Sequence, residues 1–166
     1  MDLIYKNIVT IAANEFSEYA EQLRIEDECE YNYLLGIPSK ETRYIPWYKI
    51  ELITQKYKND DKKRLDMIYG EENPLPDAYG FFERIIRVKF IQLVKTYLHN
   101  ESNNVPVELK KMTDFFEKMA QSDDFDIRNL LGIAIFEGIT SEQDEFKLIE
   151  RLLGDKSKEI FYNAIH

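Results

Sequence analysis

Cysteine and histidine, the side chains best suited to nucleophilic catalysis and zinc binding, occur three times in this chain, as Cys29, His99 and His166. A Cys–His nucleophile pair must lie within hydrogen-bond reach, and a structural zinc site takes about four nitrogen or sulfur ligands. The spacing of the three residues supports neither arrangement, and no GxSxG, P-loop or GxGxxG motif occurs. The sequence therefore predicts no catalytic residue, no metal site and no cofactor, and it indicates that the protein is not an enzyme.

An acidic cluster, Asp123, Asp124 and Asp126, has two interpretations. Magnesium prefers several carboxylates together. Acids just before a helix also accept its unpaired N–H groups and favour its dipole. We expect these acids to cap a helix. A metal-dependent helical enzyme that uses the acids is an alternative, but no Glu-x-x-His pair accompanies them.

A second acidic run, from Glu26 to Glu30, is followed by Tyr31 and Tyr33. It does not have the pattern of a helix start. Nine of the 11 tyrosines and the single tryptophan lie in residues 1–83. Tyr and Trp are enriched at protein interfaces, and loop acids attract a basic partner. One interpretation is a solvated acidic loop with half-buried tyrosines. The other is a partner-binding surface, whose expected residues are Glu26, Asp27, Glu28, Glu30, Tyr31, Tyr33, Tyr44, Trp47 and Tyr48, with Asp123, Asp124 and Asp126 as a second group.

Apolar residues recur at three- and four-residue steps along most of the chain, which predicts helices. The expected fold is all-α, with about seven helices in one compact bundle over residues 1–166. Residues 1–70 form a Tyr-rich N-terminal part, and 77–166 form a helical core whose helices pair antiparallel as in HEAT repeats. The main helices are expected at 3–23, 46–58, 78–99, from 106, at 125–137, and as two more before the C-terminus.

The connections between these helices carry two further expectations. Residues 26–45 are expected to be a linker, in which Tyr33 to Ile37 could form a short strand. Asn59, Asp60 and Asp61 either break the second helix or cap a short next one.

The charge balance narrows the class of partner. The chain has 22 Lys and Arg against 31 Asp and Glu, a formal net charge of −9. Nucleic-acid binding and docking on anionic membranes both need a basic surface, so neither is expected. One cysteine allows no intrachain disulfide, and no signal peptide or membrane span is recognisable. We therefore expect a cytoplasmic protein that binds a basic protein partner.

Residues 110–120, 124–131, 135–139 and 152–154, together with Asn14-Glu15-Phe16 late in the first helix, carry a family resemblance. This pattern of helices and caps resembles small, acidic, all-helical bacterial immunity proteins of polymorphic or contact-dependent toxin systems. The resemblance implies a cytosolic inhibitor that binds one cognate toxin domain, such as a basic nuclease, and it carries no active-site residues. The alternative is a helical scaffold or regulatory adaptor that binds a non-toxin protein or forms a homo-oligomer.

Overall fold

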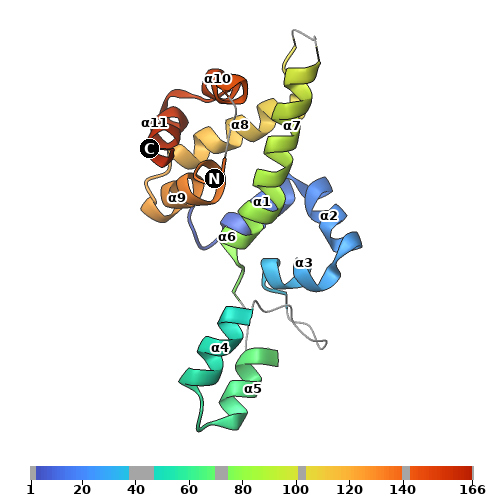
Figure 1. Cartoon of the computed structure of the whole chain (residues 1–166), viewed down its shortest axis with the longest axis vertical. Helices are drawn as coiled ribbons and strands as arrows, with labels where there is room; N and C mark the ends of the chain where they lie inside the picture. The colour runs from blue at the N-terminus through green and yellow to red at the C-terminus, as the bar shows by residue number, and fades with distance from the viewer. Residues whose placement is uncertain (1–2, 38–46, 70–74, 101–103, 140–142, 166) are drawn as a thin grey trace. The chain divides into compact units, whose positions relative to one another are not determined.

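The computed structural model describes residues 3–37, 47–69, 75–100, 104–139 and 143–165 (Figure 1). Every regular element in these ranges is helical, which confirms the all-α prediction. The described ranges hold ten separate helical rods. The increase over about seven has three sources: the first helix is broken, the expected linker contains a helix, and a short helix starts at Asp61.

The chain divides into two compact units, Val9–Asp77 and Met1–Ile8 with Ala78–His166. We call them the N-terminal unit and the C-terminal unit. The placement of both in one domain over 1–166 stays a prediction.

In the N-terminal unit, the expected helix at 3–23 is interrupted at Phe16. The backbone of Phe16 leaves the helical region, with φ −115° and ψ 46°, while its side chain is buried. Beyond this break the chain forms two hairpin-like pairs, in which α2 packs on α3 and α4 packs on α5 (Figure 1). The helices of the unit are α1 (Ile8–Glu15), α2 (Ser17–Glu26), α3 (Glu28–Leu35), α4 (Trp47–Lys56) and α5 (Asp61–Tyr69).

The prediction of a linker at 26–45, with a strand at 33–37, is wrong over the described residues, because α3 occupies Glu28–Leu35. The carboxylate of Asp27 accepts the N–H of Glu30 at 3.1 Å and so caps the helix start. At the other end Gly36 adopts a left-handed φ of 70°, which allows the N–H of Ile37 to reach the carbonyl of Asn32 at 2.8 Å. The acidic run is therefore a helix start, and Gly36 ends the helix where a strand was considered.

The C-terminal unit agrees closely with the expected helices. Three consecutive elements, α6 (Ala78–Phe81), η1 (Phe82–Arg87) and α7 (Val88–His99), form one rod over the expected 78–99. The others are α8 (Val107–Ala120), α9 (Phe125–Leu130) continued by η2 (Leu131–Phe136), α10 (Gln143–Leu152) and α11 (Asp155–Ala164).

A chain of phenylalanine rings holds this unit together. Phe90 of α7 meets Phe116 of α8, which meets Phe136 of η2, which meets Phe161 of α11. The ring centroids are 5.0, 6.0 and 5.2 Å apart in edge-to-face contacts, and all four side chains are fully buried. Four helical rods thus share one aromatic core.

Two π-helical segments, η1 and η2, pack against each other within the unit. In η2 the N–H of Glu137 donates to the carbonyl of Gly132 at 2.8 Å, five residues back. Gly132 also faces Ile160, whose Cγ2 would lie 3.3 Å from an added Cβ. The absence of a side chain at Gly132 therefore allows α11 to approach the widened turn.

Glu117 of α8 caps the start of α11. Its carboxylate accepts the N–H of Lys156 at 2.8 Å and the hydroxyl of Ser157 at 3.0 Å. Gly154 makes room, since a side chain there would collide with the Glu117 carboxylate. No helix in the described ranges has the length and apolar character needed to cross a membrane.

Candidate functional site

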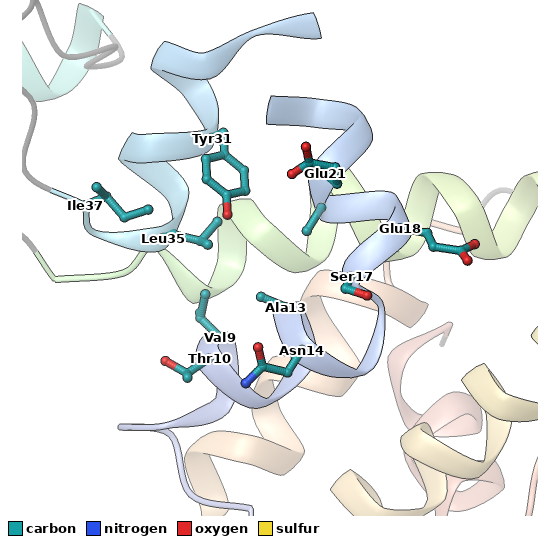
Figure 2. Close-up of a pocket in the computed structure, with 11 residues that line it drawn as sticks. Val9, Thr10, Ala13, Asn14, Ser17, Glu18, Glu21, Tyr31, Leu35 and Ile37 are labelled. Carbon is teal, nitrogen blue, oxygen red and sulfur yellow. The ribbon is translucent and has the colours of Figure 1, made fainter. Parts of the chain in front are cut away.

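A groove of about 660 Å³ opens in the N-terminal unit, where α1 and α2 face α3 (Figure 2). Its apolar surface comes from Val9, Ala13, Ala20, Leu35 and Ile37. Its polar surface comes from Thr10, Asn14, Ser17, Glu18, Glu21 and Tyr31. A concave surface that combines apolar side chains with polar groups is typical of a binding site.

Local structure explains how the groove forms. Because the helix breaks at Phe16, α1 and α2 are separate helices that both contribute residues to its wall. The cap at Asp27 starts α3, which carries Tyr31 and Leu35 to the opposite side. Figure 2 shows Val9 and Leu35 directed toward the middle of the groove, with the Tyr31 hydroxyl pointing the same way.

Negative charge is concentrated around this groove. Residues 9–37 contain seven carboxylates and one arginine, a net −6 of the chain's −9. Glu18, Glu26 and Glu28 are exposed, and Ile25 between them in sequence is 73% exposed. Acids around exposed apolar side chains present a surface that attracts cations and can bury apolar groups of a partner.

One of the groove's two carboxylates is already paired. Arg24 donates to Glu21 through Nε at 2.8 Å and through Nη2 at 2.5 Å. The hydrogen bond from Arg24 lowers the pKa of Glu21 below its ordinary value, and the Glu21 carboxylate raises the pKa of Arg24. Glu18, one turn earlier, makes no ion pair with any residue that the structure describes.

Tyr33 lies on α3, as Tyr31 does, but it contacts α4 and does not line the groove. The ammonium of Lys49 on α4 donates to the Tyr33 hydroxyl and lies 4.0 Å from the carboxylate of Asp77. Burial lowers the pKa of Lys49, but the bond with Tyr33 and the charge of Asp77 outweigh it, so the pKa is raised. Tyr33 thus links α3 to α4 through its interaction with Lys49.

The remaining predicted residues of the first group are distributed as follows. Glu26 ends α2, while Glu28 and Glu30 occupy the first turn of α3, so the run from Glu26 to Tyr31 lies at one helix junction. Tyr48 is exposed on α4. Trp47 begins α4, although its side chain and all of Tyr44 lie outside the described residues.

The second predicted group, Asp123, Asp124 and Asp126, lies in the C-terminal unit and not in the groove. Asp124 accepts the N–H of Asp126 at 2.9 Å and the N–H of Tyr5 at 2.8 Å. The cap interpretation is therefore confirmed for Asp124, which also ties residues near the N-terminus to α9. Within the described ranges no group of three or more His, Cys, Asp or Glu side chains is placed to hold a metal ion.

The C-terminal unit has a hollow of about 530 Å³ between the α9–η2 rod and α11. Phe125 and Ile133 line it with exposed fractions of 65% and 40%. Arg128, which also lines it, lies over the Phe125 ring and donates to the carbonyl of Ser122 at 2.6 Å. The charged residues of this lining are one cation, Arg128, and one anion, Glu137, whereas those of the groove are the two carboxylates of Glu18 and Glu21.

Of the predicted partner-binding residues that the structure describes, Tyr31 lines the groove, whereas the acids from Glu26 to Glu30 lie at the α2–α3 junction and do not line it; the α1–α2 side of the groove was not predicted. Val9, Ala13, Ser17, Glu18 and Glu21 belong to the helix that appeared simply amphipathic. A sequence signal for this side of the groove was present. Asp27, with Glu30 three residues later and Gly36 beyond, is the pattern of a capped helix, and a helix there would pack on the helix before it.

The fold and site define an all-helical protein with an acidic groove at the junction of three helices. A family described as a domain of unknown function, DUF7674, matches residues 57–166, about two thirds of the chain, so the chain belongs to this family. The match covers nearly all of the C-terminal unit and leaves out α1, α2 and α3, which form the groove. Neither the curated proteins nor the solved structures compared with the chain match it.

Proposed function

We propose that this protein is a cytoplasmic immunity protein that binds and neutralises a cognate bacterial toxin domain, such as a nuclease, through protein–protein contacts. The observation that carries the proposal is the acidic groove between α1, α2 and α3. A nuclease binds phosphates through a basic surface, so an inhibitor that covers this surface needs a complementary acidic one.

The distribution of charge supports this proposal. A net −6 in residues 9–37 places most of the chain's formal negative charge on the segment that forms the groove, with Glu18 and Glu21 in the groove lining itself, and leaves −3 for the remaining residues. Such a field accelerates association with a basic partner and discriminates against acidic ones. The apolar floor and Tyr31 then provide area that is buried once the complex has formed.

The helices outside the groove would form a rigid frame that supports the binding surface. We propose that the helices of 77–166 pair antiparallel as in HEAT repeats, and that both units join in one bundle. The buried phenylalanine chain and the Glu117 cap support a rigid frame of this kind. A rigid frame reduces the conformational entropy that binding would cost.

The test begins with the tagged full-length chain as bait for the lysate and secreted fraction of the source cell. We expect recovery of the C-terminal domain of one large secreted protein, in a complex that weakens with salt. That domain is then expressed in a test host with and without the chain. Growth arrest by the domain alone and rescue by the chain would support the proposal, whereas no rescue would refute it.

Matched variants locate the interface. Glu18→Lys and Tyr31→Ala alter the groove, whereas Glu51→Lys makes the same charge change at an exposed position of α4 outside it. We expect the first two to weaken rescue and Glu51→Lys to preserve it. Equal rescue by all three variants would remove the groove from the interface.

A helical adaptor is the second candidate, favoured by the hollow in the C-terminal unit. Phe125 and Ile133 are exposed there, within the residues that the family match covers. A partner or a second copy of the chain could cover them. Light scattering over a range of concentrations tests self-association, which Phe125→Ser should abolish; a monomer at all concentrations would argue against the homo-oligomer.

A further inference from the structure

The pair formed by Arg24 and Glu21 lies at the edge of the groove. Arg24 is the one basic residue among seven acids in 9–37, and it holds Glu21 through two hydrogen bonds. The two side chains are 43% and 50% exposed. An exposed ion pair contributes little stability, so its arginine can be exchanged for another.

We infer that the groove binds an arginine-bearing helical segment of a basic partner, and that Arg24 competes with the partner's arginine for Glu21. This inference depends on the proposed function only for the identity of that partner. The Glu21 carboxylate already binds a guanidinium through both oxygens, which is the geometry that distinguishes arginine from lysine.

The rest of the groove suits the same occupant. An arginine stem can lie over Ala13 and Leu35, because such stems cover apolar surface while the charged head stays in water. The Tyr31 ring flanks the opening, where a guanidinium can stack on its face (Figure 2). Glu18 offers a second carboxylate one helical turn from Glu21, which matches the spacing of charges on a docked helix.

Three other occupants fit less well. A second copy of the same segment would bring two surfaces of −6 together. An acidic peptide meets the same repulsion. A purely apolar helix would leave the Glu18 carboxylate beside it without a cation, while Glu21 would keep Arg24.

The test uses labelled alanine-rich peptides of about 15 residues, near the shortest length at which isolated helices form in water. The peptides carry arginine, lysine or glutamine at the same positions on one face. Fluorescence anisotropy at about 0.15 M salt measures Kd for the full-length chain, since exposed charges more than about 8 Å apart are then screened. We expect the arginine peptide to bind more tightly than the lysine peptide, and the glutamine peptide to bind least.

Variants separate competition by Arg24 from bulk charge. Arg24→Gln frees Glu21 and should tighten the arginine peptide about two- to five-fold, the range expected for an exposed ion pair. Arg64→Gln is the matched control, because Arg64 pairs with Asp61 at the same three-residue spacing on α5 and does not line the groove. It should leave Kd unchanged.

A double-mutant cycle completes the test. Glu21→Gln should weaken binding and should remove the gain from Arg24→Gln when the two are combined. Equal effects of Arg24→Gln and Arg64→Gln, or equal binding of the arginine and glutamine peptides, would overturn the inference.

The two proposals fail in different ways. If Arg24→Gln tightens the peptide but the chain rescues no host from a toxin domain, the groove inference stands and the immunity function does not. If rescue occurs but Arg24→Gln and Glu21→Gln bind the toxin domain as Arg64→Gln does, the immunity function stands and the groove inference does not.

Discussion

Glu26 and Glu28 are two residues apart and both exposed, yet they lie at opposite kinds of helix end. Glu26 is the last residue of α2, where the dipole disfavours an anion, and Glu28 is the first residue of α3, where the dipole favours one. Glu26→Lys and Glu28→Lys make the same change in net charge. We therefore expect them to change the free energy of unfolding in opposite directions.

The size of this difference in unfolding free energy follows from the interaction of a charge with a helix end. A charge at a helix end contributes about 0.3–1 kcal/mol, and each Glu→Lys change both removes an anion and adds a cation, so the two variants should differ by about 1.2–4 kcal/mol. Gln22 donates to Glu26 at 3.2 Å, and loss of this exposed bond offsets part of the gain. For a chain of this length about 1 kcal/mol shifts Tm by about 2–4 °C, which predicts a gap of about 2–16 °C with Glu28→Lys the lower.

Thermal unfolding followed by far-UV circular dichroism measures this gap. Glu51→Lys, in the middle of α4, is the control for net charge and should fall between the two variants. At 1 M salt the screening length is about 3 Å, so the gap should shrink. Equal Tm values, the reverse order, or a gap that persists in high salt would refute the account of the helix junction.

Three further predictions concern the stability of the fold. Asp27→Ala should lower the free energy of unfolding by about 0.5–2 kcal/mol, whereas Asp27→Asn keeps a cap and should cost far less; similar losses in urea melts would deny the cap. Phe116→Ala removes the middle of the ring chain and should cost about 3–5 kcal/mol, and a loss below about 1 kcal/mol in the same melts would contradict its burial. Glu117→Ala should cost about 1–3 kcal/mol and increase amide exchange at Lys156 and Ser157, so unchanged exchange at these two N–H groups would exclude the cap.

The all-α class and the helices of 78–166 could be predicted from the amino-acid sequence alone. Those helices have wide apolar stripes and are bounded by strong local signals, such as Pro106 before α8 and Asp124 before α9. Local signals of this kind depend on a few neighbouring residues, so they can be read without the fold. The acidic run next to Tyr31 was likewise visible as a candidate surface.

Other features of the fold depend on contacts between distant residues, which local sequence patterns do not report. The break at Phe16 occurs inside a continuous apolar stripe, and the groove depends on it. The cap from Glu117 to Ser157 joins residues 40 positions apart, and the π turn at Gly132 accompanies the close approach of Ile160. Each depends on which distant side chains meet, and helical periodicity reports only which face of a helix is apolar, not what packs against it.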